Sequence, residues 1–189
     1  MFLFLFQDSL SNLKCFSLTC FDVTDEYDIA VLSFIRQMLH LEELTLILHI
    51  SGRSILKSAA DFDNKILIHM KELHRFIFYI QSEERINDPT ILASISDIEQ
   101  SFTNKKYGQV TCMIDYLDSS SILHRIFSLP TKFNYLDKIS NNIPNIIFNS
   151  VIYLELKDKN PFKHEFFVRL QRSFSNVKHL SISNIQQSF

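Results

Sequence analysis

Five short segments of the chain share one order of apolar and variable positions, apolar-x-x-apolar-x-apolar. They begin at Leu13, Leu41, Leu73, Val151 and Val177. The last two apolar residues of each segment are two positions apart, so they lie on one face of a β-strand. A strand this short cannot bury its apolar face alone, whereas stacked strands bury it together. The pattern therefore predicts adjacent parallel strands whose buried residues include Leu44, Leu46, Phe76, Phe78, Leu154 and Leu156.

Apolar residues at helical spacing follow several of these predicted strands. Thr24 precedes two acidic residues and is a good N-cap for a helix. Asn160-Pro161 begins a second predicted helix, because proline is favoured at the first helical position, and Thr131 begins a third over residues 133–139. Alternating apolar residues predict further strands over 110–116 and 122–128. Helices between parallel strands imply right-handed crossovers.

The spacing of the five segments is that of a repeat protein. Their starts are separated by 28, 32, 78 and 26 residues, and three of these intervals are close to the ~20–29-residue period of leucine-rich repeats. We therefore expect an α/β fold, a degenerate leucine-rich-repeat solenoid with a mainly parallel sheet and helices on its convex side. Residues 1–189 are expected to form one domain, with a degenerate or inserted region at about 82–150. We also expect the chain to be a fragment of a longer protein.

The same segments resemble the leucine-rich-repeat region of F-box and leucine-rich-repeat proteins. Residues 101–110, which read SFTNKKYGQV, resemble an uncharacterised invertebrate group of such proteins. The resemblance covers most of the chain, but no segment that resembles an F-box precedes Leu13. It implies a non-catalytic protein–protein interaction module, with substrate recognition in a ubiquitin ligase adaptor as a more specific role.

The expected contact surface is the exposed, concave face of the sheet, which solenoids use for binding. It is formed by the residues that alternate with the buried ones, and Tyr and Arg are enriched at the energetic centres of interfaces. The candidate residues are Glu43, Arg75, Tyr79, Tyr153, Glu155, Lys157 and His179. We expect Arg75, Tyr79 and Tyr153 to form the centre. The alternative is an ordinary solvated face on which Glu43 pairs with Arg75.

Composition narrows the classes of partner and compartment. The net charge is −2, which gives no electrostatic basis for binding nucleic acid. No apolar run approaches the ~20 residues needed to span a bilayer. Three cysteines, an odd number without paired spacing, argue against a disulfide scaffold. We therefore expect an intracellular protein, cytoplasmic or nuclear, with an unknown protein partner and no nucleic-acid or membrane partner.

Motifs for catalysis or cofactor binding are absent from the sequence. The seven histidines include no pair at metal-binding spacing within one predicted helix. Glu42 and Glu43 are neighbours in a strand, so they point to opposite faces and do not form an acid/base pair. Two glycines leave little material for a phosphate-binding loop. We expect no catalytic residues, metal, cofactor or small-molecule substrate. A decayed or truncated repeat fragment without a partner, and an enzyme with a dispersed site, remain the alternatives.

Overall fold

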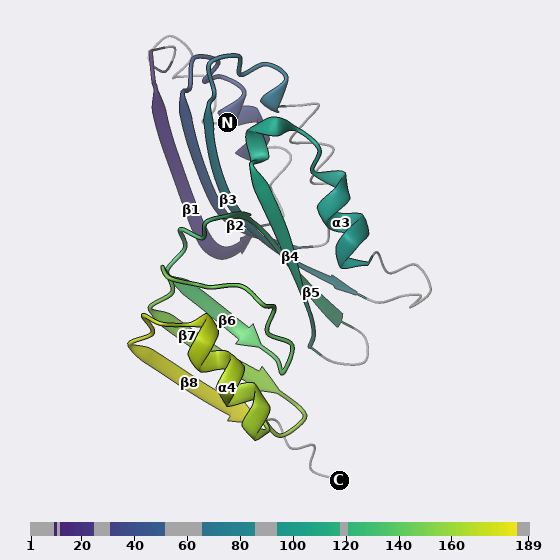
Figure 1. Cartoon of the computed structure of the whole chain (residues 1–189). Helices are drawn as coiled ribbons and strands as arrows, with labels where there is room; N and C mark the ends of the chain where they lie inside the picture. Colours follow the sequence, from purple (N-terminus) through teal and green to yellow (C-terminus); the bar gives the residue numbers. More distant parts are fainter. Residues whose placement is uncertain are drawn as a thin grey trace.

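Two β-sheets form most of the described chain (Figure 1). The computed structural model describes residues 10, 12–24, 31–51, 66–85, 94–117 and 121–184. Sheet A has the strand order β1-β2-β3-β5-β4, and sheet B has the order β6-β7-β8. The strands are β1 (Cys15–Thr24), β2 (Glu43–Ser51), β3 (Arg75–Arg85), β4 (Gln109–Tyr116), β5 (Ser121–Leu129), β6 (Tyr135–Ile139), β7 (Tyr153–Asp158) and β8 (His179–Asn184). The helical elements are α1 (Leu32–Ile35), α3 (Ile95–Ser101), the 3₁₀ turn η4 (Lys105–Tyr107) and α4 (His164–Ser173).

The first three repeated segments pair as the sequence predicts. β1, β2 and β3 are parallel, with Cys15 opposite Glu43 and Glu43 opposite Arg75. The last two segments pair in parallel in sheet B, where Tyr153 lies opposite His179. The six residues predicted to be buried in these strands are all buried. The apolar pattern therefore identifies these strands, their direction and their register.

The predicted leucine-rich-repeat solenoid is wrong, because the five segments do not form one continuous parallel sheet. The free edge of β3 is taken by β5, which runs antiparallel to it and places Phe127 opposite Tyr79. β4 then pairs antiparallel with β5, so sheet A is mixed. A strand of reversed direction at this edge prevents the next parallel repeat from stacking there. The segments that begin at Val151 and Val177 lie instead in the separate sheet B.

The predicted helices differ from the observed ones in length and position. Thr24 ends β1, and residues 25–30, where the predicted helix begins, lie outside the described residues; α1 has four residues. α4 begins at His164, three residues after Pro161. The helix predicted over 133–139 is wrong, because Tyr135–Ile139 is strand β6. The strands predicted over 110–116 and 122–128 are confirmed as β4 and β5.

The backbone of β6 is irregular, which explains why its apolar spacing resembles that of a helix. Lys138 has a φ of 50°, in the left-handed region, and the pairing with β7 shifts between Leu136 and Ile139. This irregularity brings Leu136 and Ile139, three positions apart, into the same core. Asp137 lies two residues after Tyr135, and both line a cavity on the other side of the strand.

A hydrophobic core lies on each face of sheet A. The first contains Leu44, Phe78 and Ile126 of the sheet together with Ile98 of α3. The second joins Tyr79 and Phe127 of sheet A to the apolar residues of sheet B and α4. The inserted region therefore fills part of the face that the sequence predicted to be exposed. The assignment of residues 1–189 to a single domain stays a prediction.

A substitution of Leu44 tests the first core, because the side chain of this β2 residue is completely buried. We expect Leu44→Ala to lower the free energy of unfolding by about 2–5 kcal/mol, the usual range for a core leucine. Denaturant unfolding measures this change, with Leu39→Ala as the matched control because Leu39 is 47 % exposed. A loss below about 1 kcal/mol for Leu44→Ala, or equal losses for the two variants, would contradict the core position of Leu44.

Candidate functional site

The residues predicted for one exposed face lie on two different sheets. On sheet A, Nη1 of Arg75 is 3.1 Å from Oε2 of Glu43, which is the predicted ion pair between neighbouring strands. Both side chains are well exposed, so solvent screens the pair and it adds at most about 1 kcal/mol. Tyr153, Glu155, Lys157 and His179 lie on sheet B. The predicted contact surface is therefore not one continuous face.

The prediction that Tyr79 lies at the centre of an exposed face is wrong. Its side chain is 2 % exposed, and the centroid of its ring is 4.4 Å from that of Phe133. The hydroxyl donates a hydrogen bond of 2.7 Å to Oε1 of Gln81. Burial raises the pKa of Tyr79 well above its ordinary value. Tyr79 is a core residue because the segment after β5 packs on this part of sheet A.

An aromatic row crosses the strands of sheet B. Tyr135 of β6 lies opposite Tyr153 of β7, and Tyr153 lies opposite His179 of β8. The rings of Tyr153 and His179 are stacked, with centroids 4.5 Å apart and planes 7° from parallel. Tyr153 is 45 % exposed, although it is held in a regular strand. We call Tyr135, Tyr153 and His179 the aromatic row.

A cavity of about 580 Å³ lies beside this row, between the two sheets. Sheet A contributes Phe21, His49 and Gln81 to its wall, and sheet B contributes Tyr135, Asp137 and Tyr153. This volume is within the range of sites that hold a small ligand or a large side chain. The aromatic row and the cavity share Tyr135 and Tyr153, so they form one continuous surface.

A bulge in β1 positions the aromatic ring at the sheet A side of the cavity. The pairing of β1 with β2 shifts between Cys20 and Val23, so Phe21 stands outside the regular ladder. Its ring meets those of His49 and Tyr135 edge to face, with centroids 5.8 Å away in both cases. These contacts connect β1 and β2 of sheet A with β6 of sheet B.

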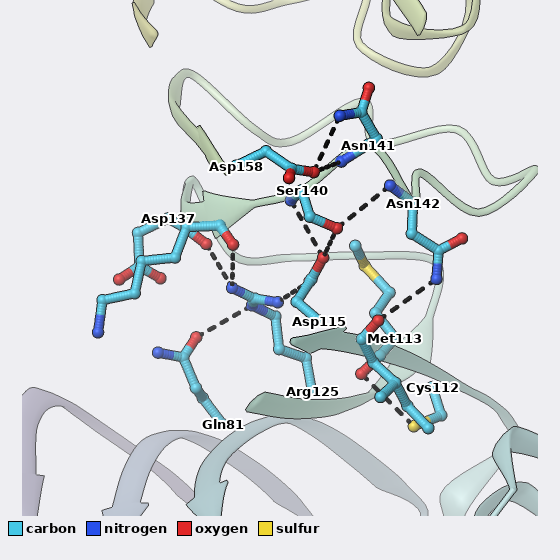
Figure 2. Close-up of polar contacts among 12 residues, drawn as sticks. Gln81, Cys112, Met113, Asp115, Arg125, Asp137, Ser140, Asn141, Asn142 and Asp158 are labelled. Carbon is cyan, nitrogen blue, oxygen red and sulfur yellow. Dashed lines mark hydrogen bonds and ion pairs between the residues drawn. The ribbon is translucent and has the colours of Figure 1, made fainter. Parts of the chain in front are cut away.

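Buried Arg125 holds the base of the site together (Figure 2). Its Nε donates to Oε1 of Gln81 at 3.2 Å, and Nη1 donates to Oδ2 of Asp115. Nη2 donates to the backbone oxygens of Asp137 and Lys138 in β6. The guanidinium therefore ties three strands of sheet A to one strand of sheet B.

The other oxygen of Asp115 extends this network into sheet B. Oδ1 accepts hydrogen bonds from the backbone nitrogen of Ser140, at 3.0 Å, and from its hydroxyl. The next residue, Asn141, donates from its backbone nitrogen to Oδ2 of Asp158, 2.7 Å away, at the end of β7. Figure 2 shows this chain of contacts running from Gln81 to Asp158. Three of the strands joined by these contacts, β3, β6 and β7, contribute Gln81, Asp137 and Tyr153 to the wall of the cavity.

Asp137 is the acidic residue of the cavity wall for which the described residues supply no ion pair. It is 9 % exposed and lines the cavity, and Oδ1 has no hydrogen-bond partner within the described part of the chain. Arg125 binds the backbone oxygen of Asp137, and its Nη1 is directed to Asp115. A buried carboxylate oxygen without a partner is rare, because desolvation without a hydrogen bond is costly.

The pKa values of neighbouring groups follow from burial and from this carboxylate. Burial lowers the pKa of His49, while Asp137 opposes that shift and Arg125 adds to it. Burial raises the pKa of Tyr135, and the negative charges of Asp137 and Glu155 raise it further. His49 is consequently neutral near neutral pH, and the tyrosine hydroxyl stays protonated.

Sequence reasoning missed Gln81, Asp115, Arg125, Tyr135 and Asp137. One signal was present, since Arg125 and His124 interrupt an otherwise apolar run in β5. A charged residue in a strand that is buried on both faces requires a buried partner. Asp115 satisfies that requirement from the neighbouring antiparallel strand. Which residue pairs with Arg125 depends on the β4–β5 pairing, and the repeat interpretation did not include that pairing.

Comparison with protein-family models, curated proteins and solved structures finds no match. Among the described residues, no group of three or more His, Cys, Asp or Glu side chains is placed to hold a metal ion. The described helices include none that is long and apolar enough to cross a membrane. The expectations of no catalysis, no cofactor and no small-molecule substrate stay predictions.

His124, on the opposite face of β5 from Arg125, gives the stability of the protein a defined pH dependence. The side chain of His124 is 3 % exposed. Its Nδ1 is 3.6 Å from Oε1 of Glu84, which is too long for a hydrogen bond. Burial lowers the pKa of His124 to about 4. Between the ordinary value of 6.5 and about 4, the unfolded chain binds a proton that the folded chain does not. The stability that neutral His124 contributes is therefore complete above pH 6.5 and is lost as the pH falls toward 4.

The free energy of unfolding of the wild-type protein should fall as the pH drops from about 6.5 to about 5. We expect this fall to be smaller in His124→Leu, by up to about 1.4 kcal/mol per pH unit. Denaturant unfolding at a series of pH values measures the slope. His164→Gln, which removes an exposed histidine from α4, is the matched control. The same slope in His124→Leu and wild type would show that His124 is not held in its neutral form by burial.

Proposed function

We propose that this chain is a non-catalytic protein-binding module whose contact surface is the aromatic row of sheet B with the adjoining cavity. The observation that carries the proposal is the exposure of Tyr153, which is 45 % exposed and stacked on His179 in a regular strand. Tyrosine combines a large apolar ring with a polar hydroxyl, and it loses little rotamer entropy when it is bound. Rings that are already held in place lower the entropic cost of binding.

Polar residues beside the row suit the rim of a protein interface. Glu155 and Lys157 follow Tyr153 on the same face of β7, and both are partly exposed. Interfaces commonly have a centre of aromatic residues surrounded by polar and charged ones. These two residues and His179 keep the role in protein binding that the sequence predicts for them. Glu43 and Arg75 lie at the start of β2 and β3 and belong to a different surface.

The free cysteines support an intracellular location for this module. Cys15, Cys20 and Cys112 are all unpaired, and Cys15 is exposed. Exposed free thiols persist in reducing compartments and tend to be oxidised elsewhere. We therefore propose a cytoplasmic or nuclear protein. The more specific role implied by the sequence resemblance, substrate recognition for a ubiquitin ligase, stays a prediction.

Affinity capture with variants of the aromatic row tests the proposal. We expect Tyr153→Ser/His179→Ala to weaken the binding of a captured partner roughly 30-fold, which corresponds to the loss of an interface hot spot of about 2 kcal/mol. The measurement is quantitative capture from cell extract, followed by titration of the partner with purified protein. Phe167→Ala is the matched control, because it removes an exposed ring from α4 instead of from the row.

Two outcomes would contradict this assignment. If the double variant is folded and binds the partner as tightly as wild type, the contact surface lies elsewhere. If wild type reproducibly captures no partner, the alternative of a truncated or decayed repeat fragment is favoured. Thermal unfolding of each variant shows whether a loss of binding reflects a loss of fold.

A further inference from the structure

Among the described residues that line the cavity, one acidic side chain has no ion-pair partner. Arg125 lies next to Asp115, so these opposite charges offset each other beneath the cavity. Nζ of Lys138 is 4.0 Å from Oε2 of Glu83, and this pair lies at the cavity wall. His49 is neutral near neutral pH because it is buried. The remaining charge is that of Asp137, whose Oδ1 has no hydrogen-bond partner among the described residues.

This balance of charges favours a cation over an anion. Arg125, the arginine that the described part of the chain places beside the cavity, is completely buried, and all three of its nitrogens donate to oxygens of the protein. Four of its five N–H groups are used in these internal contacts. Lys138 carries the remaining positive charge at the wall, where Glu83 offsets it. An anion in the cavity would meet the carboxylate of Asp137, whereas a cation would neutralise it.

Aromatic rings form the walls through which such a cation would enter. Phe21 stands on the sheet A side, and Tyr135 and Tyr153 stand on the sheet B side. The faces of aromatic rings attract cations, and their apolar surface packs against an aliphatic stem. A cavity of about 580 Å³ has room for a long side chain and for the water around its end. The entrance also borders the aromatic row, where the proposed partner would lie.

We propose that the cavity receives a lysine side chain of the bound protein, with its ammonium group at the carboxylate of Asp137 and its aliphatic stem between Phe21 and the two tyrosines. This inference rests on the proposed function, because the lysine belongs to the partner that covers the aromatic row. An ammonium supplies hydrogen-bond donors and a positive charge to the carboxylate of Asp137. Partner recognition then depends on one buried charge pair at the centre of an aromatic surface.

Titration of the isotope-labelled full chain with small probes, followed by nuclear magnetic resonance, tests this inference. The probes are N-acetyl-lysine-N-methylamide, its neutral analogue N-acetyl-norleucine-N-methylamide, and n-butylammonium, which has the charge and stem without a peptide. We expect the lysine probe to shift the signals of Asp137, Tyr135 and Phe21 at millimolar concentration. The norleucine probe should bind at least roughly tenfold more weakly, since it cannot make the charge-assisted hydrogen bond to the carboxylate.

Variants of opposite expected effect separate recognition from folding. Asp137→Asn keeps the shape of the side chain and removes its charge, and we expect roughly tenfold weaker binding of the lysine probe. Lys138→Asn removes the opposing positive charge, and asparagine tolerates the left-handed backbone at this position. We expect this variant to bind the lysine probe roughly two- to fivefold more tightly. A destabilised protein would not produce such a gain. Glu165→Gln, an exposed substitution on α4, is the control.

Three results would overturn the inference: no shift of cavity signals by the lysine probe, equal affinity for the lysine and norleucine probes, or unchanged affinity in folded Asp137→Asn. Binding of n-butylammonium without binding of the lysine probe would indicate that the cavity takes a free amine and not a lysine of a protein, and this result would also overturn the inference. Failure here with intact capture through Tyr153 and His179 leaves the protein-binding function standing. Lysine binding without a captured partner would contradict that function while supporting the chemistry of the cavity.

Discussion

The structure depends on the burial of one arginine between the two sheets. Arg125 is completely removed from solvent, and a charge in such a place is strongly destabilising unless it is paired and hydrogen-bonded. The chain meets this requirement with Asp115, the side chain of Gln81 and two backbone oxygens of β6. These acceptors come from both sheets, so the electrostatic requirement is satisfied only when β6 is docked against sheet A.

The candidate site follows from this constraint. Because Arg125 holds the backbone of β6 at Asp137 and Lys138, the side chain of Asp137 is left to line the cavity. The same strand presents Tyr135, in register with Tyr153 of β7. Phe21 reaches this surface from a bulge in β1 on the other sheet. A polar network thus supports an aromatic surface, and rigid support of this kind is what a preorganised binding site needs.

The sequence predicts local pairing well and the connection between sheets poorly. The apolar-x-x-apolar-x-apolar pattern predicts the parallel pairing of Leu44 with Phe76 and of Leu154 with Leu180, because the period of a strand fixes which residues share a face. It does not reveal that β5 reverses direction beside β3, since an alternating strand has the same pattern in either direction. The burial of Tyr79 and the roles of Asp115 and Asp137 all depend on that reversal. The irregular backbone at Lys138 allows β6 to bury apolar residues three positions apart, a spacing that is otherwise typical of a helix.

A double-mutant cycle between Arg125 and Asp115 tests the central claim most directly. Denaturant unfolding of Arg125→Met, Asp115→Asn and the double variant gives the coupling energy between the two groups. We expect Arg125→Met to lower the free energy of unfolding by about 3–5 kcal/mol, because it leaves a buried carboxylate unpaired. Asp115→Asn in the same chain should recover a large part of that loss. A loss below about 1 kcal/mol for Arg125→Met, or a coupling energy near zero, would contradict the claim that the structure depends on buried Arg125 and its pairing with Asp115.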